Sequence, residues 1–181
     1  ADQPVADFCA AAGVACFRGS LHDVAGRFKD TLWNYGFDVF VRVCADSPLL
    51  DHRLVDHAVG IFSKRPVDMV TNILPRTYPR GQSVEVLRSD TFLEAYGGMA
   101  GKDDLEHVTP FFYRHHDRYV IHAMQSPVDL SGIRLCVDTP SDMNLCSSII
   151  RLMTKPHWEY SLPRIVKLYE QAMQQHLKEV A

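Results

Sequence analysis

Two aspartates stand where ligand-binding carboxylates are found in proteins with open α/β sheets. Asp46 follows the apolar, β-branched run at residues 37–44, and Asp138 directly follows a second run at residues 133–137. Ligands of such sheets bind beyond the carboxyl ends of the strands, and a pair of carboxylates there suits Mg²⁺. The alternative is that Asp46 forms a turn and Asp138 caps a helix.

Three further groups of polar residues could take part in binding. The loop at residues 73–81 carries arginines and a tyrosine, which suit carboxylates or phosphates, although a solvated surface loop is the alternative. The segment at residues 18–27 reads as a strand end that opens a helix, where backbone N–H groups favour anions. The nine histidines lack zinc-site spacing, so a zinc-dependent hydrolase is the weakest interpretation.

The elements that must position these groups alternate between helix and strand. Helical patterns are predicted at residues 5–12, 21–35, 50–62, 89–96, 103–113, 139–154 and 162–178. Strands are predicted at residues 14–18, 37–44, 68–72, 84–86, 118–124 and 133–137, with residues 37–44 as a central parallel strand. This order predicts an α/β fold with a mainly parallel sheet.

Composition excludes several classes of protein. The length of 181 residues favours one compact domain, and 46% hydrophobic residues exclude a disordered chain. Because 19 basic residues face 22 acidic ones, there is no electrostatic case for binding nucleic acid or an anionic membrane. The five cysteines form no C-x-x-C pair, and no apolar run could span a bilayer, so we expect a cytoplasmic protein.

Five sequence strings, taken in order, carry a family resemblance. They are R-G-S-x-x-D-V (residues 18–24), V-R-V-x-x-D-x-P-L-x-D (41–51), Y-P-R-G-x-x-V-E-V (78–86), E-H-V-T-P (106–110) and V-D-T-P-x-D (137–142). Together they resemble the spore-coat-polysaccharide type of cytidylyltransferase, a relative of the CMP-KDO synthetases and acylneuraminate cytidylyltransferases.

The resemblance implies a nucleotide-diphospho-sugar transferase (GT-A-like) fold. It implies that CTP and a sugar or sugar acid yield a CMP-sugar and pyrophosphate for surface polysaccharide biosynthesis, with Mg²⁺ as the cofactor. The roles that the resemblance assigns are catalysis and metal binding by Asp46 and Asp138, nucleotide binding by Arg18, Gly19, Ser20 and Asp23, and sugar binding by Tyr78, Arg80, Glu85, Glu106 and His107. It also implies a homo-oligomer, expected to be a dimer.

One family feature has no counterpart in this sequence. Family members begin with a strand and a loop of the form R-x-x-S-x-R-L-P-x-K that holds the triphosphate, and this chain resembles a member without its first roughly sixty residues. We therefore expect residues 1–155 to be the C-terminal part of the cytidylyltransferase-like domain and residues 156–181 to be a linker and helix. The alternative function is a non-catalytic nucleotide- or sugar-binding module. We expect the chain as it stands to bind CTP weakly, to release no measurable pyrophosphate and to self-associate through the strand edge near residues 39–43.

Overall fold

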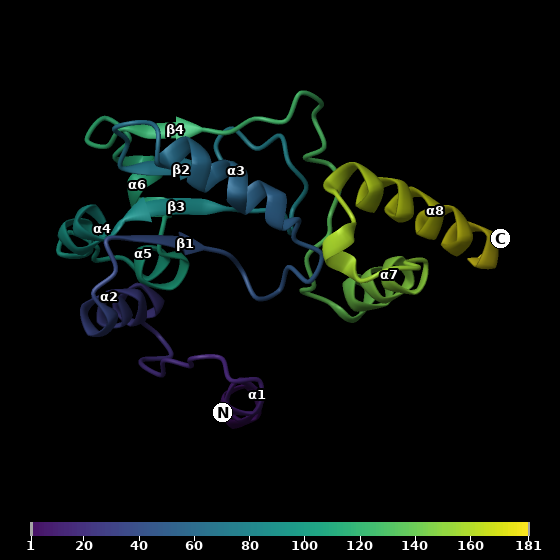
Figure 1. Cartoon of the computed structure of the whole chain (residues 1–181), viewed down its shortest axis with the longest axis horizontal. Coiled ribbons are helices and arrows are strands. Elements are labelled where there is room, and N and C mark those ends of the chain that lie inside the picture. Colours follow the sequence, from purple (N-terminus) through teal and green to yellow (C-terminus); the bar gives the residue numbers. More distant parts are fainter. Residues whose placement is uncertain (1, 181) are drawn as a thin grey trace. The chain divides into compact units, whose positions relative to one another are not determined.

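The computed structural model describes residues 2–180 (Figure 1). Within them the chain forms two compact units. The first unit comprises Ala1–Asp38 and Arg88–His116, and the second comprises Val39–Leu87 and Asp117–Ala181. The first unit is therefore made of two segments that are distant in sequence.

The first unit is helical. Its helices are α1 (Gln3–Ala11), α2 (Val24–Tyr35), α4 (Ser89–Tyr96), α5 (Lys102–His107) and α6 (Pro110–Arg114). Helix α2 packs against α4 and α5, and α5 packs against α6. Stacking of Phe92 on Phe112, with ring centroids 6.3 Å apart, supplies part of the apolar contact.

Sequence-based boundaries in this unit are partly wrong. The helix expected at residues 103–113 is two helices, because Val108 takes a φ of 73° and Pro110 then begins α6. The strand expected at residues 14–18 does not form. The end of α2 is as predicted, since Gly36 has a φ of 67° and donates its N–H to the Leu32 carbonyl.

The second unit contains a four-stranded sheet. Its elements are β1 (Val39–Arg42), α3 (His52–Phe62), β2 (Met69–Thr71), β3 (Glu85–Arg88), β4 (Ile121–Ala123), α7 (Pro140–Arg151), the 3₁₀ helix η1 (His157–Glu159) and α8 (Leu162–Val180). The strand order is β1-β3-β2-β4. Strand β2 runs parallel to β4, with Val70 opposite His122, and antiparallel to β3, with Val70 opposite Val86. The α/β class is confirmed, and the sheet contains both a parallel and an antiparallel pairing.

Two strand predictions need correction. Strand β1 lies at an edge of the described sheet rather than at its centre, and its side chains are exposed or half-buried. Residues 133–137 do not form a strand in the structure, because their only ladder contact is a single parallel bridge between Arg134 and Arg80. Self-association through the β1 edge stays a prediction.

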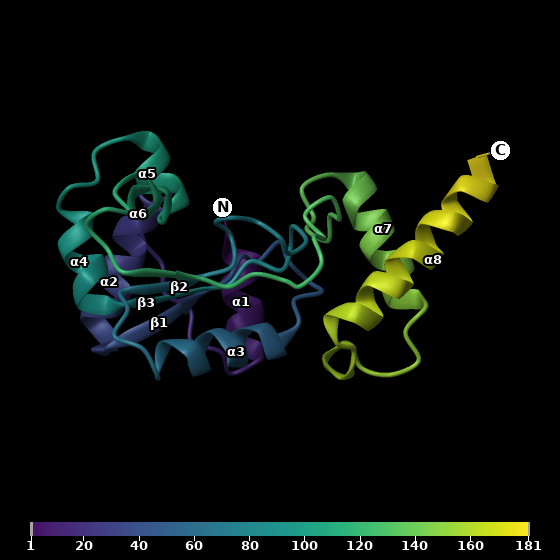
Figure 2. The same ribbon diagram turned by 90° about the horizontal axis from the view of Figure 1, so that it is seen from above.

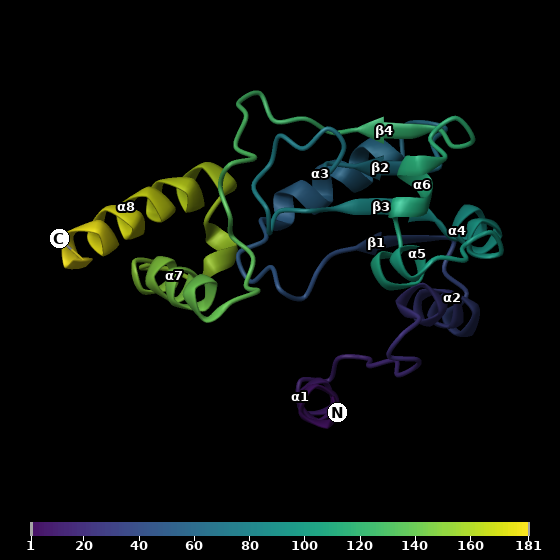
Figure 3. The ribbon, with the colours of Figure 1, turned by 180° about the vertical axis from the view of Figure 1, so that it is seen from behind.

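Two apolar clusters hold the second unit together. Helix α3 covers one face of the sheet (Figure 2), and its Ala58 and Phe62 share a cluster with Val70 and Val86. Helices α7 and α8 pack against each other (Figure 3), and their Ile149 and Ile165 share the other cluster with Leu49 and Tyr78. The C-terminal helix therefore belongs to the second unit.

The start of α7 is fixed by local sequence, as predicted. Thr139 and Asp142 form a reciprocal capping box, and Pro140 takes the first helical turn. Among residues 2–180 no helix is long and apolar enough to cross a membrane.

Candidate functional site

Asp46 and Asp138 lie on neighbouring segments of the second unit. The Val137 N–H donates to the Asp46 carbonyl at 2.8 Å, which joins the segment after β1 to the one before α7. Burial raises the pKa of the Cys136 thiol, the nearby Arg134 guanidinium lowers it, and both Asp138 and Asp46 raise it. The backbone bond is thus the contact that places the two segments side by side.

The Asp138 carboxylate is surrounded by polar partners. It accepts hydrogen bonds from the Arg134 guanidinium and, at 3.5 Å, from the Cys136 thiol. Arg134 also contacts Asp142 at 3.2 Å through Nε, while the Asp138 N–H donates to Asp142. Asp138 is half-exposed, so it stays open to a ligand from solvent.

The donor chemistry of this pair fits Mg²⁺. Magnesium is usually held by one or two carboxylates and completes its shell with waters and substrate phosphates. Across the described part of the chain no three His, Cys, Asp or Glu side chains form a metal-binding group, so an all-protein cage is not present there. A carboxylate pair that shares the ion with a nucleotide is the arrangement that these residues allow.

The loop between β2 and β3 is held closely against the segment that precedes Asp138. Arg80 donates its N–H to the Ile133 carbonyl at 3.0 Å and accepts from the Leu135 N–H at 2.7 Å. Gly81 has a φ of +91°, and a Cβ on it would lie 2.5 Å from the Leu135 carbonyl carbon. Only glycine fits this approach, and it leaves the Arg80 side chain exposed.

Two buried amides that sequence analysis missed hold the same loops. Gln82, fully buried, donates to the Leu49 carbonyl at 2.7 Å and accepts from the Asp51 N–H at 3.0 Å. Asn72 donates to the Gln82 carbonyl and accepts from the Val84 N–H. Because each of these hydrogen bonds joins segments that are distant in sequence, no periodic pattern could reveal the bonds. The only sequence feature that pointed to these residues was their place beside the Y-P-R-G string.

Glu85, expected in a sugar pocket, is fully buried in β3 and pairs with Arg42 of β1 at 2.5 Å. Its role in substrate binding stays a prediction, whereas its contribution to the sheet follows from the geometry. A buried charge left without its partner is costly.

We predict that Glu85→Gln lowers the free energy of unfolding by about 2 kcal/mol, because the charge-assisted bond to Arg42 is lost. Urea unfolding would measure this. The control is Glu94→Gln on the exposed side of α4, which should change stability by less than about 0.5 kcal/mol. Equal effects of the two substitutions would contradict the assignment.

Tyr78, also expected at a sugar pocket, has a buried ring. It packs in the cluster with Leu49 and Leu135, and burial raises the pKa of its phenol. The hydroxyl approaches the Gln125 carbonyl at 3.5 Å. The Tyr78 hydroxyl therefore lies at the border of the core. Its predicted contact with the sugar stays a prediction.

The residues expected to bind nucleotide lie in the first unit. Arg18 donates to the Gln3 side chain at 2.9 Å, and the Ser20 hydroxyl accepts from the His22 N–H. Gly19 approaches Arg27, whose Cγ would lie 2.8 Å from an added Cβ. These contacts order the segment without showing what it binds.

Asp23 has a defined structural role. It caps α2 by accepting the Gly26 N–H at 2.6 Å, and its other oxygen accepts the Tyr96 hydroxyl of α4 at 2.7 Å. A side chain at Gly26 would collide with this carboxylate, with a Cβ 2.3 Å from Oδ2. The D-x-x-G spacing is thus explained by capping, and nucleotide binding by Asp23 stays a prediction.

The hydrogen bond to Asp23 raises the pKa of Tyr96 from its ordinary 10.0 to about 12. Since the folded-state pKa is the higher one, the stabilisation is complete below pH 10 and is lost as the pH rises towards 12. We expect Tyr96→Phe to remove this part of the pH dependence, measured by denaturant unfolding across that range. Tyr35→Phe, in the same unit, should retain it; loss in both would argue against the Asp23 pair.

Glu106 and His107 are exposed on α5. Glu106 lies 4.0 Å from Lys102, and His107 lies 3.9 Å from Asp103, in i,i+4 pairs that have little effect on stability. Asp103 and the more buried Asp104 both bind Arg114 of α6. The structure thus brings Asp46, Asp138 and Arg80 to joined segments of one unit, while Glu106 and His107 belong to the other.

The open four-stranded sheet and its covering helices are those of an α/β protein with a nucleotide-sugar transferase-like fold. A sequence profile of the cytidylyltransferase family matches residues 1–178, and the chain belongs to that family.

Comparison with individual proteins agrees. The fold is similar to that of a cytidylyltransferase from Leptospira borgpetersenii serovar Hardjo-bovis (strain JB197), with a TM-score of 0.87 and 26% identity over 96% of this chain and 72% of that one. An uncharacterized protein of Methanocaldococcus jannaschii is 34% identical over 146 residues, which are 80% of this chain and 59% of that protein. The chain thus spans about 59% of the length of this curated relative.

Proposed function

We propose that this chain carries the metal- and acceptor-binding part of a cytidylyltransferase that activates a sugar for surface polysaccharide biosynthesis. The observation that supports it is the joining of the Asp46 and Asp138 segments by the Val137 N–H. Family membership supports the use of CTP. In this reaction a sugar hydroxyl oxygen bonds to the α-phosphorus of CTP, the bond from that phosphorus to the bridging oxygen breaks, and pyrophosphate leaves as the hydroxyl proton is released.

In this proposal the acidic residues bind the metal ion and the basic residues bind anionic groups. Asp46 and Asp138 would hold Mg²⁺, which when bound neutralises phosphate charge. Arg134, which touches Asp138, holds that carboxylate in place. The exposed Arg80 is placed to take a sugar carboxylate in a two-pronged contact, since its backbone is fixed on both sides by residues 133–135.

The remaining assignments follow from the same proposal. Arg18, Ser20 and Asp23 would contact the nucleotide, and Glu106 and His107 the sugar. A cytoplasmic site of action suits five cysteines that are all unpaired in disulfides. We also propose that the acceptor is a sugar of the spore-coat-polysaccharide type and that the protein is a dimer.

CTP binding is the first test. Isothermal titration with CTP should show weak binding that requires Mg²⁺, and titration with a panel of eight- and nine-carbon sugar acids should show binding of at least one of them. Arg80→Lys should weaken binding of the acid and leave CTP binding unchanged. CTP binding that is absent, or indifferent to Mg²⁺, would overturn the proposal.

A further inference from the structure

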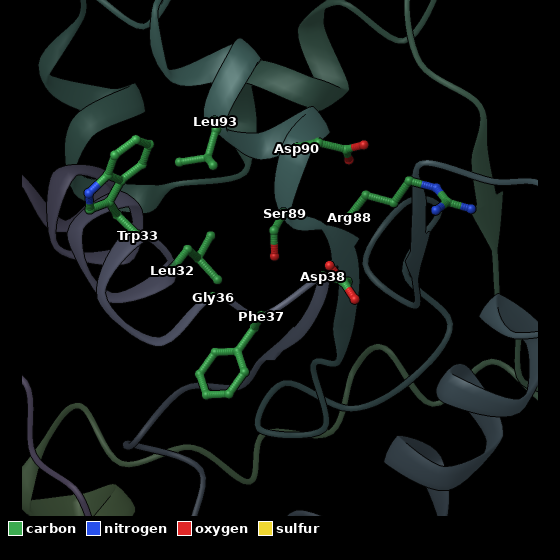
Figure 4. Close-up of a pocket in the computed structure, with 9 residues that line it drawn as sticks. All are labelled: Leu32, Trp33, Gly36, Phe37, Asp38, Arg88, Ser89, Asp90 and Leu93. Atoms are coloured by element: carbon green, nitrogen blue, oxygen red, sulfur yellow. The ribbon is translucent and has the colours of Figure 1, made fainter.

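The first unit contains two features that the proposed reaction does not use. One is a hollow of about 580 Å³ between α2 and α4 (Figure 4), whose lining includes Asp38 and Arg88. The Ser89 hydroxyl beside it is buried, so it is closed to a ligand from solvent. The other feature is a pair of cysteines, Cys9 and Cys16, which lie close enough together to react with each other.

The segment that follows α1 folds back along that helix. The Val14 N–H donates a hydrogen bond to the Cys9 carbonyl at 2.9 Å. Four residues further on, the Arg18 guanidinium donates to the Gln3 side chain at 2.9 Å. Because Val14 and Arg18 flank Cys16, these two contacts hold Cys16 beside the helix that carries Cys9.

The side chains of the two cysteines are in contact as well. Burial, the charge of Cys16 and a hydrogen bond with the Cys16 side chain together raise the pKa of the Cys9 thiol. A hydrogen bond raises the pKa of a thiol when the neutral form donates it, so the Cys9 thiol is the donor and the Cys16 sulfur is the acceptor. The backbone contacts and the contact between the thiols thus agree on one arrangement of the pair.

The two sulfurs differ in their access to solvent. Cys16 is exposed, whereas Cys9 is half-buried. Cys16 also lies within residues 14–20, which form no helix or strand, so its sulfur can move from a hydrogen bond to an S–S bond of about 2.0 Å. Cys136 and Cys146 are both buried. A small oxidant in solvent therefore reaches Cys16 before it reaches these two residues.

We propose that Cys9 and Cys16 form an oxidation site, at which hydrogen peroxide converts the two thiols to a disulfide. The Cys16 thiolate attacks one peroxide oxygen, the O–O bond breaks, and Cys16 becomes a sulfenic acid while the other oxygen leaves as water. The Cys9 sulfur then bonds to the Cys16 sulfur, gives up its proton and displaces the hydroxyl group as a second water. The two sulfurs lose two electrons and the peroxide gains them, so two thiols and one peroxide give one disulfide and two waters.

The disulfide closes a loop between residues 9 and 16 and restricts the segment that leads to Arg18. In a reducing compartment most disulfides are transient and redox-sensing, which suits the proposed cytoplasmic site of action. The site lies in the first unit and uses neither Asp46 nor Asp138, so it holds or fails independently of the proposed reaction.

Thiol titration of the full chain, unfolded after mild treatment with hydrogen peroxide, tests this. The chain has five cysteines, and we expect the treatment to remove two of the five thiols, with a mass loss of two hydrogen atoms per chain. Peptide mapping should place the link between Cys9 and Cys16, and a reductant should reverse it. Cys44→Ser is the matched control: Cys44 is half-buried and lies in the second unit, so this variant should also lose two thiols.

Two further variants separate the roles of the sulfurs. Cys9→Ser leaves Cys16 without a second thiol, so its sulfenic acid should persist and be labelled by dimedone, a reagent for sulfenic acids. Cys16→Ser removes the attacking thiol and should give neither label nor disulfide at Cys9. Retention of all five thiols, a link between the Cys16 residues of two chains, or equal labelling of the two variants would overturn the proposal.

Discussion

Replacing Asp46 or Asp138 by Asn is expected to raise the dissociation constant for CTP in the presence of Mg²⁺ about tenfold, and replacing both by a factor of about 100. Each change removes one of the two anionic oxygen donors that the proposed site offers a hard cation. The stimulation by Mg²⁺ should vanish in the double variant, which titration with and without the metal would measure.

The matched control for these variants is Asp56→Asn. Asp56 is exposed on α3 of the same unit, and its replacement by Asn removes the same charge from the molecule. Its CTP binding should equal that of the unchanged chain. If Asp56→Asn weakens binding as much as Asp46→Asn does, net charge rather than a metal site is responsible, and the site assignment is wrong.

Gly81→Ala is expected to lower the free energy of unfolding by about 4 kcal/mol or more. A φ of +91° strains any residue with a Cβ, and here that Cβ would also lie 2.5 Å from backbone carbon and 2.7 Å from backbone nitrogen. Because those atoms belong to Leu135 and Cys136, relief of the clash must move the segment that leads to Asp138. Thermal or urea unfolding would measure the loss.

Gly60→Ala serves as the comparison for Gly81→Ala. Gly60 lies in α3 with nothing within 4 Å of an added Cβ, so alanine should raise stability by up to about 1 kcal/mol through helix propensity. Similar destabilisation at both positions would show that the close approach at Gly81 is not the cause.

The features that sequence predicted well are those whose causes are local. The helix start predicted at residue 139 depends on a capping box between residues three apart, and the helix end predicted at residue 35 depends on the left-handed conformation of Gly36 alone. The interactions that fix these helix ends involve only residues that are close together in sequence. The pairing of the Asp46 and Asp138 carboxylates stays a prediction, and the structure joins their segments through the bond from the Val137 N–H to the Asp46 carbonyl.

The features that sequence missed depend on partners far along the chain. An apolar run at residues 133–137 looks like a strand, but a strand needs a ladder partner, and here only Arg80 supplies one bridge. The place of β1 at an edge depends on the order of all the strands. Gln82 and Asn72 carry no periodic signal, so their buried bonds to other loops became visible only in the structure.

Asp51 links two helix starts that are made at different times. Its carboxylate, in a residue 4% exposed, accepts the Arg53 N–H at the start of α3 and, at 2.7 Å, the N–H of Leu162, 111 positions further on, at the start of α8. During synthesis at roughly 5 to 20 residues per second, on the order of 10 s pass between the two. Throughout that interval the Asp51 carboxylate can accept hydrogen bonds only from the start of α3 and from water. The second unit therefore reaches its final packing only after the ribosome has passed Leu162.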